Sequence, residues 1–381
     1  MNPPIIIIGS GFGAYQLIKT IRRTNKEQPI SVFTLDAGHD YNKPDLSHVF
    51  SKQQSSADLI RTSATDFASE FNITLHPFTE VEHIDTKLQQ IVVQGIVHPY
   101  SKLVLATGAK TFIPPMLGEM NNDVLTLNSL QEFESAQPQL QHAQRILVIG
   151  AGLIGTEIAM DLASCGKSVT VVDPSEAVMA NMLPTIIADA LQKKMQAAGI
   201  TFKLNRSISS LSRTNTGICA LLNSTEICEV DCVISAAGLK ANTGLAKNSG
   251  LEVNMGILVN QQLQTSAQHV YALGDCAEIN GKVRAYLQPI MLSANALAKT
   301  LLAQPTDLAL PAMLIKVKTP LMPIQLGGDT VMGATSWQVE IDELGSSVKA
   351  YNQHKQMIGF VVTEGHMKNA FPLLRALPAN L

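Results

Sequence analysis

RILVIGAGLIGTEIAMDL, residues 145–162, is the most informative stretch of this chain. Its apolar run ILVI (146–149) is typical of a strand buried on both faces of a parallel sheet. Gly150, Gly152 and Gly155 follow as G-x-G-x-x-G, and apolar residues then recur at helical spacing. In such a turn the first glycine permits the tight bend, the second lets a pyrophosphate approach the backbone, and the third lets helix and strand pack closely. The stretch therefore predicts a dinucleotide-binding unit.

The chain begins with a second copy of this device, IIIIGSGFGAYQLIKTI, residues 5–21. The strand Ile5–Ile8 leads into Gly9, Gly11 and Ala14, which form G-x-G-x-x-A before another helical pattern. The alternative is that both are ordinary glycine turns of an α/β protein. A strand before and a helix behind each turn favour two bound dinucleotides, each with its diphosphate at the positive end of a helix.

An acidic residue ends the strand that follows each turn. SVFTLDAG (31–38) contains Asp36, and SVTVVDPSE (168–176) contains Asp173. A carboxylate in this place can accept hydrogen bonds from a ribose diol. Asp173 would repel a 2′-phosphate, and VVDPSEAVMANM (171–182) has no arginine to bind one. The sequence therefore predicts NADH rather than NADPH as the nicotinamide cofactor.

The composition bounds the class of protein. Of 381 residues, 46% are hydrophobic and 15% charged, so two or three domains of ~100–150 residues can each bury a core. The net charge of −3 argues against a general nucleic-acid binder. The apolar runs are far shorter than the ~20 residues of a membrane span, and we recognise no signal peptide. The cysteines are scattered, which favours reduced thiols and a cytoplasmic protein. They are Cys165, Cys219, Cys228, Cys232 and Cys276.

Three further stretches carry a resemblance to a known family. They are KLVLATGAK (102–110), DCVISAAGLKANT (231–243) and TSAQHVYALGDCAE (265–278). With the N-terminal G-x-G-x-x-A, they resemble the signatures of the two-dinucleotide flavoprotein reductases, the family that includes glutathione reductase. The resemblance implies an α/β fold with two Rossmann-like dinucleotide-binding domains, one for FAD and one for NAD, and a C-terminal α+β domain.

The same resemblance implies the order of the domains along the chain. Residues 1–110 and 240–310 would form a discontinuous FAD-binding domain, interrupted by an NAD-binding domain at 111–239. A C-terminal domain would follow at 311–381, and its own pattern supports this because three alternating stretches predict antiparallel strands before a closing helix. These stretches are SWQVEIDE (336–343), SSVKAYNQ (346–353), QMIGFVVTEG (356–365) and, for the helix, HMKNAFPLLRAL (366–377).

Two short stretches narrow the resemblance. DYNKPDLS (40–47), with Lys43 before Pro44, and IKVKTP (315–320) are similar to those of the bacterial NADH-dependent rubredoxin reductases. This branch implies that hydride passes from NADH to FAD and that single electrons leave for rubredoxin, a small acidic iron protein. It also suggests a pathway such as alkane hydroxylation. A reductase of the same architecture that serves a Rieske-type ferredoxin or a flavorubredoxin would share all of these motifs.

The resemblance also implies which residues hold the cofactors. As catalytic residues, Lys43 would lie near flavin N5 and Glu157 would form an ion pair that orients it. The alternative is a solvated loop lysine and a glutamate in the first turn of a helix. The residues implied for FAD are Gly9, Ser10, Gly11, Phe12, Gly13, Ala14, Asp36, Lys43, Pro44, Val81, Ala106, Thr107, Gly108, Gly274, Asp275, Gln288 and Lys318. Those implied for NAD are Gly150, Gly152, Leu153, Ile154, Gly155, Glu157, Asp173, Ala237 and Gly238.

Two of these assignments rest on the family alone. Lys318 could instead be an alternating strand residue that faces water. Gln288 and Pro289 are expected to precede a helix whose N-terminal amide faces the flavin pyrimidine.

The cysteine pattern bears on the electron acceptor. Disulfide reductases of this superfamily carry C-x4-C after the first strand–helix unit or C-x-x-C in the NAD domain, and DYNKPDLS contains no cysteine. Cys228 and Cys232 are separated by three residues and are typical of a core or strand edge. Cys276 adjoins Asp275 and could lie near the flavin, with a small buried thiol as the alternative. We therefore predict that electrons leave FAD directly for an external acceptor. Lys43 and Pro44 also argue against a water-forming NADH oxidase, because such an enzyme would carry a catalytic cysteine near position 43.

The remaining expectations concern metals and partners. The nine histidines show no paired metal spacing, so we predict no metal site. Lys19, Arg22, Arg23 and Lys26 are a modest candidate patch for an acidic partner, with a solvated helix face as the alternative. A signalling flavoprotein of the apoptosis-inducing-factor type expects a basic DNA-binding surface, which the sequence does not show. We expect a monomer without a membrane span.

Overall fold

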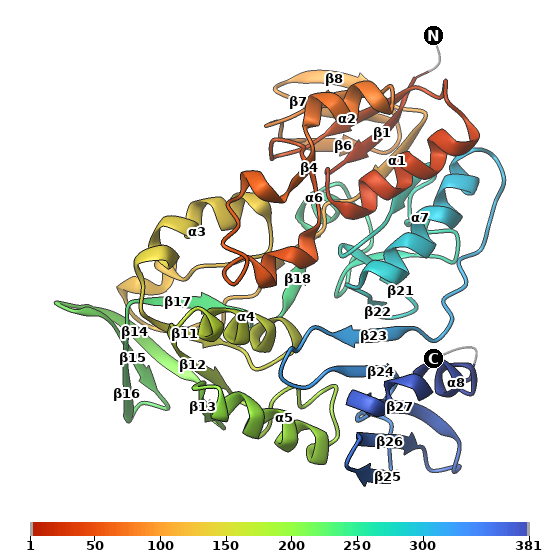
Figure 1. Ribbon diagram of the computed structural model, residues 1–381. Coiled ribbons are helices and arrows are strands. Elements are labelled where there is room, and N and C mark those ends of the chain that lie inside the picture. The colour runs from red at the N-terminus through yellow and green to blue at the C-terminus, as the bar shows by residue number, and fades with distance from the viewer. Residues whose placement is uncertain (1–2, 379–381) are drawn as a thin grey trace. The chain divides into compact units, whose positions relative to one another are not determined.

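The computed structural model describes residues 3–378, and these form two compact units (Figure 1). The first unit consists of the chain up to Lys43, Ser56–Lys110 and Leu239–Leu310. The second consists of Pro44–Ser55, Thr111–Gly238 and the chain from Pro311 onward. The segment Pro44–Ser55 thus belongs with the second unit, and so does the C-terminal region. That one unit binds FAD and the other binds NAD stays a prediction.

A parallel five-stranded sheet forms the centre of the first unit. Its strand order is β20–β9–β1–β2–β5. The four isoleucines of β1 are all buried, because helices or strands cover both faces of a central parallel strand. Ile5 pairs with Ile30 on one side and with Lys102 on the other. The strands are β1 (Ile5–Ile8), β2 (Ile30–Phe33), β5 (Thr74–His76), β9 (Lys102–Leu105) and β20 (Val270–Ala272).

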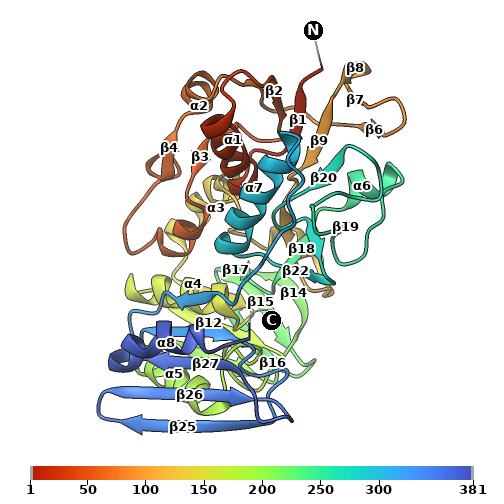
Figure 2. The same ribbon diagram turned by 90° about the vertical axis from the view of Figure 1, so that its right-hand side faces the viewer.

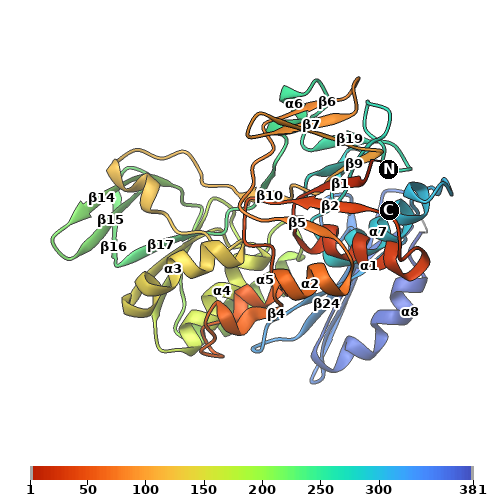
Figure 3. The same ribbon diagram turned by 90° about the horizontal axis from the view of Figure 1, so that it is seen from above.

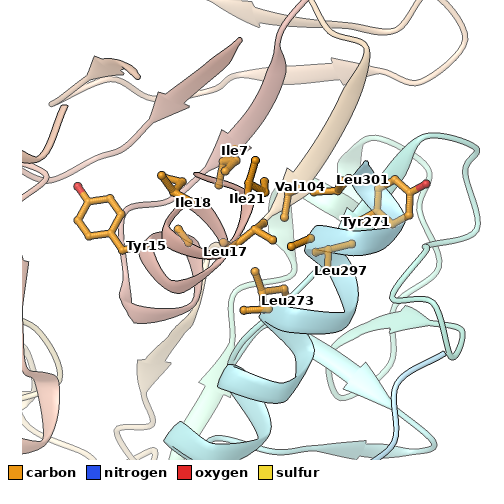
Figure 4. Packing of buried hydrophobic residues seen from close by; sticks show 14 of the residues in the cluster. Ile7, Tyr15, Leu17, Ile18, Ile21, Val104, Tyr271, Leu273, Leu297 and Leu301 are labelled. Atoms are coloured by element: carbon orange, nitrogen blue, oxygen red, sulfur yellow. The ribbon is translucent and has the colours of Figure 1, made fainter. Parts of the chain in front are cut away.

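Two helices pack together against this sheet, α1 (Phe12–Thr24) and α7 (Leu287–Leu301). Figure 4 shows their apolar side chains converging with those of the central strands. Leu17, Ile18 and Leu297 are each fully buried there. Each such side chain contributes about 1.5–3 kcal/mol relative to its exposed state, so the helical apolar spacing of the sequence is satisfied by this contact.

Smaller elements complete the first unit. They include two three-stranded sheets, β6–β7–β8 and β19–β21–β22, and two-stranded pairs formed by β3 with β4 and by β10 with β18. The strands are β3 (Asp40–Tyr41), β4 (Ile60–Thr62), β6 (His83–Asp85), β7 (Gln90–Val93), β8 (Ile96–Pro99), β10 (Ala109–Thr111), β18 (Leu239–Ala241), β19 (Ile257–Val259), β21 (Ala277–Ile279) and β22 (Lys282–Val283). The helices are η2 (Ala57–Leu59), α2 (Ala64–Glu70) and α6 (Gly244–Asn248), and η1 (Lys43–His48) begins at the last residue of the unit's first segment.

The second unit repeats the parallel arrangement with four strands in the order β13–β12–β11–β17. It also contains a three-stranded antiparallel sheet, β14–β15–β16, and Figure 3 shows the strands of this sheet side by side. The parallel strands are β11 (Arg145–Ile149), β12 (Ser168–Asp173), β13 (Thr201–Leu204) and β17 (Cys232–Ser235). The antiparallel strands are β14 (Ile208–Thr214), β15 (Gly217–Leu222) and β16 (Glu226–Val230). The helices are η3 (Glu119–Asp123), α3 (Leu130–His142), α4 (Leu153–Ser164) and α5 (Thr185–Ala197).

The C-terminal region of the second unit is an antiparallel five-stranded sheet in the order β23–β24–β27–β26–β25 (Figure 2). Its strands are β23 (Leu314–Val317), β24 (Ile324–Gly328), β25 (Ser336–Asp342), β26 (Gly345–Tyr351) and β27 (Met357–Thr363). The three alternating stretches are strands, as expected. The closing helix differs from its expected span, because η4 (Glu364–Asn369) precedes a short α8 (Ala370–Arg375). Pro372 lies in the first turn of α8, where the missing N–H of proline is tolerated.

The two Rossmann-like sheets and the α+β C-terminal region make up the predicted α/β fold class. Within residues 3–378, no helix combines the length and the apolar character that a membrane crossing needs.

Candidate functional site

The first glycine turn connects β1 to α1 and brings three of the sequence motifs together. Gly9 has a φ of +110°, and a Cβ atom added there would lie 2.2 Å from the main-chain oxygen of Ala106. An added Cβ at Gly13 would lie 3.8 Å from Cα of Gly274. At Gly11, in contrast, an added Cβ would meet nothing within 4 Å. The turn is therefore closed on the protein side and open in front of the helix, as a bound diphosphate requires.

The carboxylate of Asp36 is fixed by the same turn. Its Oδ1 accepts hydrogen bonds from Ser10 Oγ at 2.7 Å, Thr34 Oγ1 at 2.8 Å and the main-chain N–H of Gly38 at 2.9 Å. Ser10 and Thr34 also contact each other at 2.8 Å. Phe12 begins α1 and Ala14 is fully buried, so Ser10 is the side chain of the turn that reaches the acid. The sequence analysis named Asp36 and Ser10, but not Thr34 or the hydrogen bonds that join the three side chains.

Lys43 lies beside Asp275 within the first unit. The Lys43 Nζ is 3.5 Å from Asp275 Oδ2, and the lysine side chain is 34% exposed. Asp275 Oδ1 is buried and has no hydrogen-bond partner among the described residues. A buried acceptor without a donor is costly, so this oxygen is suited to a ligand that carries hydroxyl groups. The ribityl chain of FAD, which the family resemblance implies at Asp275, fits that requirement.

The ATG motif is held by a residue that the sequence reasoning missed. Thr107 Oγ1 donates to the carbonyl oxygen of Asn242 at 2.9 Å, and Asn242 Nδ2 donates back to the Thr107 carbonyl at 2.8 Å. The main-chain N–H of Asn242 also donates to the Gly108 carbonyl at 3.0 Å. These bonds join the residues that follow β9 to those that follow β18. They hold the ATG motif in a fixed position, although the two segments are far apart in sequence. The dipeptide Ala241–Asn242 gave no signal of this pairing.

The implied residues Val81 and Gln288, and the neighbouring Cys276, occupy different environments in the first unit. Val81 is buried in the hydrophobic core. Gln288 is exposed and, with Pro289, lies inside the first turn of α7 rather than before the helix, because α7 begins at Leu287. Cys276 is fully buried, and burial raises the pKa of its thiol. The cysteine is therefore the small core residue that the sequence left as an alternative.

The second glycine turn has the same geometry as the first. Gly150 has a φ of +107°, and its added Cβ would lie 2.5 Å from the main-chain oxygen of Ala236. A Cβ at Gly155 would lie 1.9 Å from the Gly150 oxygen, so the helix touches the turn directly. At Gly152 an added Cβ would meet nothing within 4 Å. Leu153 and Ile154 begin α4 beside this open space, and Ala237 and Gly238 follow β17 at the adjacent strand end.

Asp173 ends β12 and braces the second turn. Its Oδ2 accepts from the main-chain N–H of Ala151 at 2.6 Å, and its Oδ1 accepts from the N–H of Ser175 at 2.7 Å. The fold also brings an arginine close, since the main-chain N–H of Arg206 donates to the Asp173 carbonyl at 3.0 Å. The Arg206 guanidinium, however, donates to Glu226 at 3.3 Å and to the Asn205 carbonyl at 3.0 Å.

Glu157 is almost completely buried on α4 and has partners that the sequence did not indicate. Its Oε2 accepts from Ser47 Oγ at 2.8 Å, and its Oε1 accepts from the main-chain N–H of Lys318 at 3.1 Å. His48 Nε2 lies 3.8 Å from Oε2. Burial lowers the pKa of His48, and Glu157 opposes this only partly. Glu157 therefore ties both the 44–55 segment and the end of β23 to α4.

Asp161, one helical turn further along α4, does the same for the next residues. Its carboxylate accepts from the main-chain N–H of Phe50 at 2.8 Å and from the backbone and hydroxyl of Ser51. Because Glu157 and Asp161 are four residues apart, they lie on one face of the helix. These bonds are the physical reason that Pro44–Ser55 belongs with the second unit.

The residues implied for FAD are thus divided between the units. Pro44 and Lys318 lie in the second unit, where Lys318 Nζ donates to the Pro44 carbonyl at 2.9 Å. Lys318 lies just after β23 rather than within a strand, and its side chain is exposed. The residues implied for NAD all lie in the second unit. The ion pair of Lys43 with Glu157 stays a proposal, and each of the two has the partners described above.

The cysteines are all free thiols within the described part of the chain. Burial raises the pKa of Cys228, and it raises the pKa of Cys232 to about 12. Thiols of this kind are poor nucleophiles, because the thiolate is the reactive form. Cys228 and Cys232 accordingly behave as core or edge residues.

Two further groups of charged residues bear on the sequence expectations. On α1, Lys19 pairs with Asp40 at 2.7 Å, and Arg22 is buried with its guanidinium bonded to the carbonyls of Phe71 and Asn72. The candidate patch therefore loses two of its four cations. In the C-terminal region, Glu340 and Asp342 of β25 and His366 of η4 have potential ligand atoms within 4.8 Å of one another. His366 and Asp342 share a hydrogen bond of 3.0 Å and Glu340 is exposed, so we assign the group no ligand.

Replacement of Glu157 by alanine is expected to lower the free energy of unfolding by about 2–4 kcal/mol, because the Ser47 hydroxyl and the Lys318 N–H each lose a buried acceptor. Glu157→Gln keeps an acceptor and should cost less. Chemical denaturation of the purified protein measures both. Glu229→Ala is the matched control, since Glu229 is 54% exposed and only 4.0 Å from Arg145, and it should change stability by less than about 0.5 kcal/mol. Equal stability of Glu157→Ala and the control would contradict the anchoring role.

Comparison with known proteins places this geometry in a family. Residues 3–299 match the family model described as pyridine nucleotide-disulphide oxidoreductase, and residues 307–377 match the rubredoxin-binding C-terminal domain. The nitric oxide reductase FlRd-NAD(+) reductase of Aliivibrio fischeri is 55% identical over 377 residues, which cover 99% of each chain. The motif-based resemblance to the rubredoxin reductases is thereby confirmed.

Solved structures show the same fold. A ferredoxin reductase from Rhodopseudomonas palustris has a TM-score of 0.85 at 25% identity and covers 95% of this chain and 91% of its own. The NADH:rubredoxin oxidoreductase from Clostridium acetobutylicum has a TM-score of 0.80 at 19% identity and covers 99% of this chain and 95% of its own. The chain therefore belongs to the pyridine nucleotide-disulphide oxidoreductase family, as an FAD- and NAD(H)-dependent oxidoreductase with a rubredoxin-binding C-terminal domain.

Proposed function

We propose that this protein passes electrons from NADH to a rubredoxin-type domain, and that this domain belongs to a flavorubredoxin. The observation that carries the proposal is the match of residues 307–377 to the rubredoxin-binding domain. The flavorubredoxin is favoured over a stand-alone rubredoxin because the 55% identical relative has FlRd in its name. No comparison bears on alkane hydroxylation, and that expectation stays unconfirmed.

The residues described above suit this reaction. NADH supplies a hydride, and FAD, when bound, turns that two-electron donor into a source of single electrons. Each open glycine turn would hold one dinucleotide, with Asp36, Asp173 and Asp275 as acceptors for its hydroxyl groups. The half-buried thiol of Cys228 and the buried thiols of Cys232 and Cys276, whose pKa values are all raised, supply no sulfur relay, which supports direct transfer to an external acceptor.

One anaerobic experiment tests the proposal. The flavin of the purified protein is reduced with NADH and then offered a flavorubredoxin, a stand-alone rubredoxin, a Rieske-type ferredoxin, a disulfide and oxygen in separate mixtures. Rapid reoxidation by the flavorubredoxin, faster than by the other acceptors, is the expected result. Rapid reduction of the disulfide would overturn the proposal, and a preference for the Rieske-type ferredoxin would replace its acceptor.

Lys43→Met is expected to slow the reduction of bound FAD by NADH about tenfold, which corresponds to ~1.4 kcal/mol of lost transition-state stabilisation. The physical reason is that the Lys43 ammonium, held 3.5 Å from Asp275, would no longer place positive charge where the flavin ring is expected. Stopped-flow absorbance of the flavin measures the rate. Lys43→Arg keeps the positive charge and should retain most of the wild-type rate of flavin reduction. An unchanged rate in Lys43→Met would remove the proposed role of this lysine.

A further inference from the structure

A hollow of about 540 Å³ lies in the second unit, where three separate chain segments meet. The 44–55 segment supplies His48 and Lys52, α4 supplies Met160, and the end of β23 with its following loop supplies Val317 and Lys318. Each of these segments belongs to the same unit, and the anchors at Glu157 and Asp161 hold them together.

The walls of the hollow are largely apolar. Met160 and Val317 are buried, and Pro320 is exposed at the edge. An apolar recess in the surface of a folded domain favours an inserted apolar side chain from a partner, because burial on both sides removes apolar area from water.

The charged groups of the hollow are arranged by depth. Glu157 and Asp161 are each only 5% exposed, and their oxygens accept the internal hydrogen bonds of the anchors. Burial lowers the pKa of His48, which disfavours the charged form of this imidazole. Lys52 and Lys318, in contrast, are exposed, and Lys318 Nζ also donates one hydrogen bond to the Pro44 carbonyl at 2.9 Å. A partner that approaches this surface therefore meets two ammonium groups at the mouth before any carboxylate.

The candidate basic patch on α1 offers fewer free cations, because Lys19 pairs with Asp40 and the buried Arg22 is bonded to main-chain carbonyls. The residues at the mouth of the hollow, unlike those of α1, lie partly in the segment that matches the rubredoxin-binding domain. Val317, Lys318 and Pro320 lie inside the segment that matches the rubredoxin-binding domain. His48 and Lys52 follow Lys43 by five and nine positions.

We propose that this hollow is the docking site for the acidic rubredoxin-type partner, with carboxylates of the partner on Lys52 and Lys318 and an apolar side chain between Met160, Val317 and Pro320. The inference rests on the proposed function, since it names the surface that the acceptor uses. Opposite charges across such a contact speed the encounter and set orientation, while the apolar contact holds the complex long enough for electron transfer.

Lys52→Glu tests the docking site without touching a residue implied in cofactor binding. The rubredoxin domain of a flavorubredoxin is the probe, and steady-state kinetics with saturating NADH give its KM. We expect KM to rise about tenfold and its salt dependence to flatten, because a charge at the contact has been reversed. The rate of flavin reduction by NADH, measured without the acceptor, should stay that of the wild type.

Lys355→Glu is the matched control. Lys355 is exposed in the turn between β26 and β27, within the same C-terminal segment, and does not line the hollow. Equal KM values for Lys52→Glu and Lys355→Glu would overturn the docking site while leaving the proposed function intact. A rise in the KM for NADH in Lys52→Glu would also overturn it, because the hollow would then serve the donor. A wild-type protein that cannot reduce the rubredoxin domain at all would refute the proposed function, and the docking site with it.

Discussion

Gly9→Ala is expected to yield a colourless protein whose free energy of unfolding is lower by about 3–5 kcal/mol. Two physical causes add at this position. The φ of +110° is one that alanine rarely adopts, and the new Cβ would lie 2.2 Å from the Ala106 main-chain oxygen. No side-chain rotation can relieve a clash with backbone, so β1 and β9 must move apart. The loss is large against the ~5–15 kcal/mol that stabilises a typical domain.

Gly11→Ala separates folding from flavin binding in the same turn. Gly11 has a φ of −70°, which any residue adopts, and its added Cβ meets nothing within 4 Å. The free energy of unfolding of this variant should lie within about 0.5 kcal/mol of the wild-type value. Its affinity for FAD should fall at least about tenfold, because the added methyl group would occupy the space of the diphosphate. Chemical denaturation gives the stability, and quenching of flavin fluorescence gives the affinity. For Gly9→Ala, a yellow protein with wild-type stability would contradict the proposed role of this turn in folding and FAD binding.

Asp173→Ala is expected to change the ratio of kcat/KM for NADH to that for NADPH by about 100-fold in favour of NADPH, or ~2.8 kcal/mol. We propose that the Asp173 carboxylate accepts hydrogen bonds from the ribose diol of NADH and repels a 2′-phosphate. Removal of this carboxylate weakens the binding of NADH and removes the repulsion of the 2′-phosphate of NADPH. Anaerobic flavin reduction with each nucleotide measures the ratio.

The surroundings of Asp173 supply a second variant. Arg206 lies beside the Asp173 backbone, but its guanidinium is held by Glu226, which also pairs with Lys203. Glu226→Gln in the Asp173→Ala background should release the Arg206 guanidinium to bind a 2′-phosphate. The kcat/KM for NADPH should therefore rise further. Asp173 also accepts two main-chain hydrogen bonds, so FAD content and thermal stability are measured alongside as controls. An unchanged cofactor ratio in a folded Asp173→Ala protein would place the ribose elsewhere.

The features of this protein that could be predicted from the order of its amino acids are those whose physics is local. A continuous apolar run, a glycine with positive φ and an apolar helical repeat lie within about twenty residues of one another, so residues 5–21 and 145–162 each carry a whole strand–turn–helix unit. The alternation of the C-terminal stretches is equally local, and it predicted β25, β26 and β27. The family resemblance then supplied the identity of the cofactors.

The pairing of polar side chains, in contrast, emerged only from the folded chain. Asp275 with Lys43, Thr107 with Asn242 and Glu157 with Ser47 are separated by 232, 135 and 110 positions, and no periodicity connects residues so distant. The same holds for Arg22, whose charge suggests a surface position but whose guanidinium is bonded to main-chain carbonyls. Burial and hydrogen-bond geometry depend on where the chain returns after folding, whereas strand, turn and helix preferences depend on neighbours in sequence.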